Sequence, residues 1–220
     1  MIMIKQLCLI AGALFTMHET TLGSTFDFDI TGSAPGSTGL LGSNEANHSS
    51  SPATGMELNP GISYSDGGGL NLHFGWGSAP AAGGGIDLSG KLDGIYLQGP
   101  ASLGGSGGYY YNLTASFGSA YTEMKANGVS GTFNLNGFNF TDLPNAFGGG
   151  TPYTAQEQVD DFKAGHWYLN ISSDFISGGE IRGQLTAVPE PQEYAMIAGG
   201  TLLIFAWFRR REASRTVAVV

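Results

Sequence analysis

The chain has 220 residues with 36 glycines, one cysteine and a formal charge of −9 at neutral pH. One domain is expected at this length, and the many Gly, Ser, Thr and Asn residues favour turns and an all-β fold over long helices. Between Ser24 and Glu193 there are sixteen carboxylates and four basic side chains. Such a surface would repel nucleic acid and anionic lipid, so neither is expected as a partner.

Residues 1–24 are typical of a secretory signal peptide. Lys5 supplies the positive charge, Leu7–Met17 the apolar core, and Thr21–Ser24 small residues for cleavage. The core is too short to span a bilayer comfortably. Cys8 lies inside this segment, so the mature chain would contain no cysteine. That excludes disulfides, zinc fingers, cysteine proteases and iron–sulfur sites.

Residues 25–55 are expected to hold one strand and a linker. Phe26, Phe28 and Ile30 alternate with two aspartates, which is the pattern of a half-buried strand. The segment Thr31–Gly55 is rich in Gly, Ser, Pro and Asn and has no period. This composition predicts a loop or linker.

Residues 56–187 are expected to form the body of a β-domain. Strand-like runs recur there between glycine-rich turns, and they favour an antiparallel, Greek-key-like β-sandwich. In the run Gly69–Trp76, the residues Leu70, Leu72, Phe74 and Trp76 should face the same side. The other predicted runs are Ile86–Leu92, Gly94–Gly99, Tyr109–Phe117, Gly128–Phe140, His166–Ile171 and Gly179–Leu185.

One short helix is predicted within this domain. Thr154 and Glu157 have the spacing of a capping box, and Gly165 stands at a natural C-cap position. We therefore expect a helix over Ala155–Ala164 that leads directly into the strand beginning at His166.

The run from Asp160 to Leu185 resembles the C-terminal signature of the CHRD domain, a module first described in chordin and widespread in bacterial exported proteins. The resemblance covers Gly55 to Ala187 and implies an exported β-domain. In the upstream run Ile95–Ala101, Tyr96 and Gln98 occupy positions where the family often has histidines, so chemistry attached to those histidines is not expected here. The residues that carry the signature are Gly165, Trp167, Tyr168, Asn170, Gly178, Gly179, Glu180, Ile181, Arg182, Gly183, Gln184 and Leu185.

Alternation also predicts how the last strand is oriented. Ile181 and Leu185 should point inward, while Glu180, Arg182 and Gln184 share the outer face. We interpret the outer residues as a solvated surface. The carboxylate and the guanidinium would pair weakly there and protect a sheet edge from further pairing.

Catalytic motifs are scarce. The sequence has no nucleophile elbow, no zinc-protease motif, no phosphate-binding loop and no EF-hand loop. No enzyme activity and no cofactor are therefore expected. The alternative is a metal-dependent enzyme that uses His73 and His166, which would need further ligands to converge with them.

Aromatic residues offer a binding hypothesis. Tyr110 faces opposite to Tyr109 and Tyr111 in its strand, so at least one tyrosine should be presented outward. Exposed Tyr and Trp beside polar residues can stack on sugars, which makes Tyr110 and Trp76 the candidate binding residues. The alternative is that Tyr109 and Tyr111 are core residues and Tyr110 is an ordinary strand residue.

The C-terminal segment has three parts in a fixed order. Val188 and the motif Pro189, Glu190 and Pro191 come first, an apolar helix over Tyr194–Phe208 follows, and Arg209, Arg210 and Arg211 end the segment. This order resembles the PEP-CTERM sorting signal, which spans residues 188–212 here and is followed by a short tail, 213–220. The resemblance implies processing by an exosortase-type enzyme after a transient stay in the inner membrane.

These features together predict an exported cell-surface or extracellular-matrix protein. Its β-domain would have a structural role or bind a glycan or a protein, with extracellular polysaccharide or a surface protein as the partner. The arginines should stay cytoplasmic, which leaves the acidic domain outside. The alternative for the tail is a permanent single-pass anchor, although fifteen apolar residues are few for a membrane span.

Overall fold

The structure is a computed structural model, and it describes residues 24–32, 38–45, 50–117, 128–144, 151–189 and 191–216. The predicted signal peptide, Glu190 and residues 217–220 lie outside the described residues, apart from Ser24. The strands are β1 (Thr25–Thr31), β2 (Leu40–Leu41), β3 (Thr54–Glu57), β4 (Ile62–Ser65), β5 (Gly69–Trp76), β6 (Leu92–Gly99), β7 (Tyr109–Asn112), β8 (Gly131–Phe138), β9 (Tyr168–Ser173) and β10 (Ile181–Ala187). The helices are α3 (Ala155–Lys163) and α4 (Pro191–Thr216), with short 3-10 turns η1 (Gly42–Asn44), η2 (Pro80–Ala82) and η3 (Leu113–Phe117).

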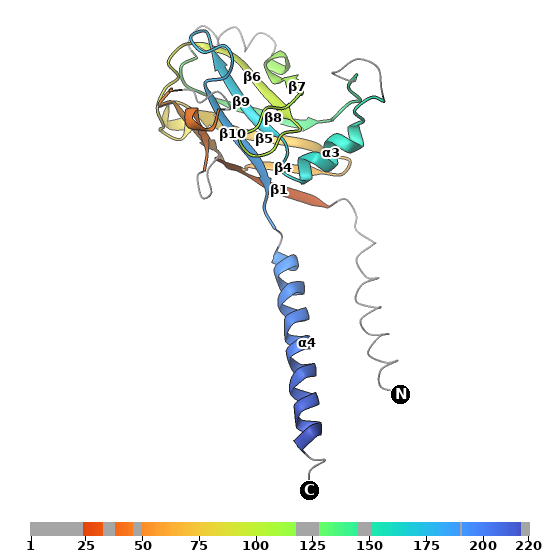
Figure 1. Ribbon diagram of the computed structural model, residues 1–220. Coiled ribbons are helices and arrows are strands. Elements are labelled where there is room, and N and C mark those ends of the chain that lie inside the picture. The colour runs from red at the N-terminus through yellow and green to blue at the C-terminus, as the bar shows by residue number, and fades with distance from the viewer. Residues whose placement is uncertain are drawn as a thin grey trace.

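Within these residues the strands form one ten-stranded antiparallel sheet that folds over on itself (Figure 1). β7, β6, β9 and β10 follow one another. One edge of β10 pairs with β9, and its other edge pairs with β1 and β2 at different positions along the strand. Similarly, one edge of β5 pairs with both β3 and β4. β8 lies on the other edge of β5. The prediction of an antiparallel all-β sandwich is therefore confirmed.

The core lies between the folded halves of the sheet. Leu70, Leu72, Phe74 and Trp76 of β5 all face it and have no exposed surface, as alternation predicts. The ring of Phe74 stacks on that of Phe133 in β8, with the centroids 5.0 Å apart. Trp76 is thus a core residue, and its prediction as a binding residue is wrong.

The segment predicted to be a linker is partly built into the sheet. Leu40 in β2 is fully buried, and β2 pairs with both β3 and β10. The Nδ2 atom of Asn44 donates to the carbonyl of Arg182 at 2.9 Å, which fixes η1 against β10. Strands of two and four residues leave no period to detect, which is why composition alone suggested a loop.

Two further runs differ from the prediction. No strand forms over Ile86–Lys91, and Ile86 is 51% exposed, although Leu88 is buried. The backbone N–H of Leu88 donates to the carbonyl of Val129 outside any strand. The run Tyr109–Phe117 divides into β7 and the 3-10 turn η3. Isolated apolar residues between glycines can be buried by a loop as well as by a strand, so the pattern did not distinguish them.

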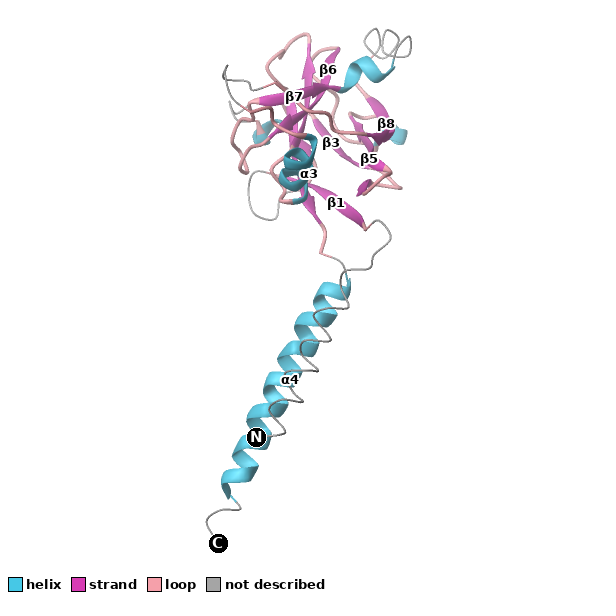
Figure 2. Ribbon diagram, turned by 90° about the vertical axis from the view of Figure 1, so that its right-hand side faces the viewer, coloured by secondary structure: helices cyan, strands magenta, loops and turns pink. Residues whose placement is uncertain are grey.

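Helix α3 begins and ends nearly as predicted. The hydroxyl of Thr154 accepts from the N–H of Glu157, and the Glu157 carboxylate accepts from the N–H of Thr154, so the capping box is formed. Val159 and Phe162 are buried, and Phe162 packs against Phe28 of β1 with the ring centroids 4.3 Å apart. Figure 2 shows the helix lying against the sheet near β1.

Helix α4 leaves the β-domain after β10 (Figure 1). It was expected over Tyr194–Phe208, but it starts at Pro191 and continues to Thr216. Proline suits the first position of a helix because its missing N–H would be unpaired there. Arg209, Arg210 and Arg211 therefore lie within the helix.

Among the described residues, no helix has both the length and the apolar character needed to cross a membrane.

Candidate binding site on the polar face of the sheet

The residues of the CHRD-like signature sort onto two faces of β9 and β10. Trp167, Leu169, Ile171, Ile181 and Leu185 are fully buried in the core. The opposite face carries Tyr168, Asn170, Arg182 and Gln184, which lie beside one another because Asn170 pairs with Arg182 and Tyr168 with Gln184 across the two strands. Gly165 follows α3 with φ 77°, a backbone conformation that favours glycine.

This polar face is not the solvated edge that the sequence predicted. Glu180, Arg182 and Gln184 are 0%, 2% and 4% exposed, and β10 has strands on both sides. The difference has a physical cause. Alternation predicts which residues share a face, but the loop around Gly105 and the turn η1 cover this face from segments far away in the sequence.

Arg182 is held by uncharged partners. One guanidinium nitrogen donates to the carbonyl of Gly105 and another to Oε1 of Gln184 at 3.2 Å. The guanidinium carbon lies 3.4 Å from the centroid of the Tyr168 ring. Gln184 in turn donates to the carbonyl of Gly165 at 2.7 Å. The guanidinium thus joins three separate segments of the chain.

Glu180 and Arg182 do not form the predicted pair. The Glu180 carboxylate accepts instead from the hydroxyl of Ser51 and the N–H of Ser89. Burial raises the pKa of Glu180, but hydrogen bonds from Ser173, Ser51 and Ser89 outweigh that effect and hold the pKa below 4.5. Glu180 therefore stays ionised at neutral pH and fixes two loops onto β10.

Glu45 is a second buried acid close to this face. Glu45 directly follows η1 and is 6% exposed. Its Oε1 atom has no hydrogen-bond partner among the described residues. Burial raises the pKa of Glu45 from 4.5 to about 7, and the charge of Arg182 opposes this shift only in part. Glu45 can therefore exchange a proton near neutral pH.

The polar face opens toward solvent over β6, β7 and β9. Tyr96 pairs with Asn170 of β9, and Gln98 pairs with Tyr110 of β7. A cavity of about 230 Å³ lies over these strands, and none of the side chains described in its wall is charged. The cavity is lined by Tyr96, Gln98, Tyr110, Asn170, Ser172, Ser177 and Gly178. We call it the polar pocket.

Tyr110 stands on the rim of the polar pocket. Its side chain is 63% exposed, and its ring meets that of Tyr96 edge to face with the centroids 6.0 Å apart. At least one tyrosine of this strand was predicted to face outward, and in the structure it is Tyr110, while Tyr109 and Tyr111 are half-buried. Asn170 lies in the floor, where it is 5% exposed, and its Oδ1 atom has no partner among the described residues. An unpaired buried polar atom costs about 1–3 kcal/mol.

Sequence reasoning found some of these residues and missed others. Tyr110 followed from alternation, whereas Tyr96, Gln98 and Asn170 were noted through the family resemblance and not as a pocket. Alternation along β9 could have added Ser172 to the face of Asn170. Glu45 carried no signal, because it lies in a segment without a period.

The two histidines proposed for a metal site lie in different settings. His166 is exposed, and its Nδ1 lies 2.9 Å from Oδ1 of Asp161 in α3. His73 is half-buried on β5, opposite Asn134 of β8. In the described part of the chain, no group of three or more His, Cys, Asp or Glu side chains is placed to hold a metal ion.

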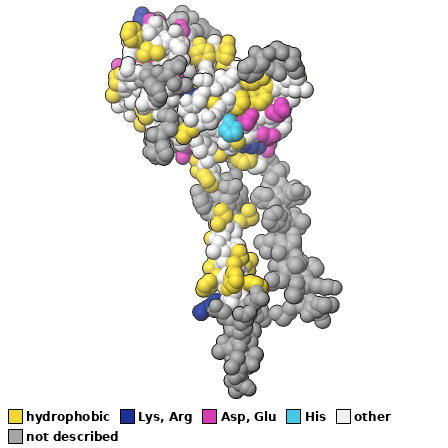
Figure 3. Space-filling model, viewed as in Figure 1, with side chains coloured by type: hydrophobic (Ala, Val, Ile, Leu, Met, Phe, Trp, Pro, Cys, Tyr) yellow, Lys and Arg dark blue, Asp and Glu magenta, His cyan; other side chains and the backbone are white. Residues whose placement is uncertain are grey.

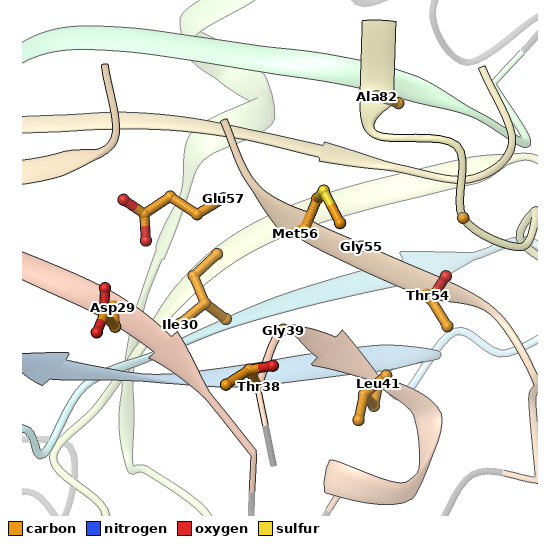
Figure 4. Close-up of a pocket in the computed structure, with 11 residues that line it drawn as sticks. Asp29, Ile30, Thr38, Gly39, Leu41, Thr54, Gly55, Met56, Glu57 and Ala82 are labelled. Atoms are coloured by element: carbon orange, nitrogen blue, oxygen red, sulfur yellow. The ribbon is translucent and has the colours of Figure 1, made fainter. Parts of the chain in front are cut away.

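A larger cavity, about 470 Å³, lies where β1 and β3 separate (Figure 4). Asp29 and Glu57 lie at one end of it, Thr54 and Leu41 lie at the other, and Met56 lies between them. Glu57 accepts a hydrogen bond from the N–H of Ile62 at 3.2 Å. Burial, and to a smaller extent the charge of Asp29, raise the pKa of Glu57 against that hydrogen bond. Glu57 thus accepts a backbone hydrogen bond at the point where β1 and β3 separate.

The fold and the polar pocket define an all-β sandwich with a small, uncharged surface cavity. Residues 97–185 of this sandwich match the family model of the CHRD domain, which is typical of secreted or extracellular proteins. The match includes Gln98, Tyr110 and Asn170 of the polar pocket as well as Arg182 and Gln184. Comparison with curated proteins and with solved structures gave no match.

Proposed function

We propose that this is an exported cell-surface or extracellular-matrix protein whose β-domain acts by binding, and not by catalysis, and that the polar pocket binds a neutral glycan. The observation that carries the proposal is the exposed ring of Tyr110 beside the amides of Gln98 and Asn170. An aromatic face can stack on the C–H groups of a sugar ring, while amides and hydroxyls hydrogen-bond its hydroxyl groups.

Charge favours a neutral ligand over an anionic one. The chain has a formal charge of −9, and Asp and Glu side chains gather near α3 on the face seen in Figure 3. This field repels uronate or sulfate groups. No cation in the wall of the polar pocket compensates for it, since the side chains described there are uncharged.

Replacing the rim tyrosine should abolish most of the binding. We expect Tyr110→Ala to weaken retention of the full chain on neutral polysaccharides by roughly tenfold, because a stacked aromatic group contributes on the order of 1–1.5 kcal/mol beyond its buried area. Retention on cellulose, chitin, xylan and mannan, with alginate as the anionic comparison, measures this effect.

Ile86→Ala is the matched control, because Ile86 is also a large exposed side chain but lies outside the polar pocket. It should bind as the wild type does. If no neutral polysaccharide retained the wild-type chain, while a surface protein did, the ligand would be a protein instead.

We further propose that the tail is a sorting signal that an exosortase-type enzyme processes near Pro189 and Pro191, with the inner membrane as a transient site. The order of proline motif, apolar helix and arginines supports this. The N–H of Val188 donates to the carbonyl of Asp27 at 2.8 Å, and helix α4 begins three residues later. Cleavage between these points would leave every strand of the β-domain intact.

Mass spectrometry of the protein from cells and from the medium measures processing directly. We expect the released form to end close to the proline motif, and Pro189→Ala combined with Pro191→Ala to retain the tail. A C-terminus at Val220 in every fraction would refute processing and favour a permanent anchor.

A further inference from the structure

Asn170 and Glu45 present two buried oxygen atoms that lack hydrogen-bond donors. Oδ1 of Asn170 and Oε1 of Glu45 are both without partners among the described residues, and both side chains are more than nine-tenths buried. Around Glu45 the charged or titratable groups are Arg182 on β10, Tyr168 on β9 beyond it, and Glu180, which directly precedes β10. Arg182 is already held by Gly105, Gln184 and the Tyr168 ring.

Gly179 brings the two oxygens to one place. A Cβ atom on Gly179 would lie 2.6 Å from Oδ1 and 2.7 Å from Nδ2 of Asn170, and 2.8 Å from the carboxyl carbon of Glu45. Its φ of 126° also favours glycine. Because Gly179 has no side chain, the amide of Asn170 and the carboxyl group of Glu45 face the same small space. The carboxyl group can accept from Nδ2 of Asn170 when it is ionised, and as a neutral acid it can donate to Oδ1.

We propose that Glu45 is a positioning residue of the polar pocket: as a neutral acid it donates its proton to Oδ1 of Asn170, which turns the amide nitrogen of Asn170 toward the ligand. The amide then donates from the pocket floor to an oxygen atom of the glycan. The proton stays on the Glu45 carboxyl group throughout, and no covalent bond changes. The ligand named in this inference rests on the proposed function, whereas the arrangement of Glu45 and Asn170 does not depend on it.

The proposed hydrogen bond from Glu45 to Asn170 makes glycan binding depend on pH. Burial gives Glu45 a pKa of about 7, so the acid is neutral below that pH and ionised above it. Ionised Glu45 presents a second acceptor to Oδ1 and repels it, which releases the Asn170 amide from its orientation. Glycan binding should therefore be strong in mildly acidic conditions and fall as the pH rises through about 7.

The first test needs no ligand. In the full wild-type chain, the side-chain amide signals of Asn170 in a nitrogen–proton NMR spectrum should shift between about pH 5.5 and about pH 8.5. In Glu45→Gln they should stay constant, because the glutamine amide donates at every pH. Asn170 signals that do not move in the wild type would overturn the inference.

The second test uses the neutral polysaccharide that retains the wild type. Wild-type affinity should fall roughly tenfold over the same pH range, while Glu45→Gln keeps the tight value throughout. Glu57→Gln, which alters a half-buried carboxyl group outside the polar pocket, should keep the wild-type profile. A Glu45→Gln profile that follows the wild type would contradict the inference. Absence of binding at every pH would count against the proposed function alone, since the NMR test would still stand.

Discussion

Replacing Arg182 with methionine should remove a large part of the stability of the β-domain. Methionine fills much of the space, but it leaves the carbonyl of Gly105 and Oε1 of Gln184 without a donor inside the protein. It also removes the charge that opposes the burial of Glu45. Each buried acceptor left without a donor costs about 1–3 kcal/mol, so the two together cost about 2–6 kcal/mol, and a domain of this kind has only about 5–15 kcal/mol in total.

Urea unfolding of the full chain, followed by tryptophan fluorescence, measures this loss, because Trp76 and Trp167 are fully buried. Lys91→Met is the control, since Lys91 is an exposed cation immediately before β6. It should change the free energy of unfolding by less than about 0.5 kcal/mol. A similarly small change for Arg182→Met would show that the guanidinium does not hold the covering loops.

The stability of the wild type should fall as the pH rises from 4.5 to about 7 because of Glu45. Its pKa is raised in the folded state, so folded protein binds more protons than unfolded protein in this window. The stabilisation is fully present below the unfolded pKa and is lost as the pH rises through the folded pKa. A shift of this size corresponds to a loss on the order of 3 kcal/mol.

Glu45→Gln isolates this contribution. The difference in unfolding free energy between the variant and the wild type should grow with pH across the window and level off above it. Glu157→Gln serves as a control, because hydrogen bonds from Thr154 lower the pKa of Glu157 and its effect therefore has the opposite sign. In Glu157→Gln, the free energy of unfolding should depend on pH between 4.5 and about 7 as it does in the wild type.

Sequence periodicity predicted the fold well in the segments where inward and outward residues alternate regularly. The alternation of β5, β9 and β10 located the inner residues correctly, and a capping box located α3, because these signals depend on neighbouring residues alone. Alternation could not tell whether the outer face of β10 meets solvent. That depends on Gly105, which lies 77 residues from Arg182.

The polar pocket was predictable only in part for the same reason. Alternation placed Tyr110 on the face opposite to Tyr109 and Tyr111 without telling which face is buried, whereas Trp76 was proposed for its residue type and proved to be in the core. Glu45 reaches the pocket floor through Gly179, a contact between segments far apart in the sequence. Local patterns carry no information on such contacts.

The pairing of β1 with β10 also constrains the order of folding. Thr31 pairs with Gln184, 153 residues later, so the first strand has no neighbour on that edge until the last strand exists. Contacts of such long separation form slowly, because a large loop must close before they contribute. The sheet therefore stays open while most of the chain is being made, and an open chain is the form that a narrow membrane pore can admit.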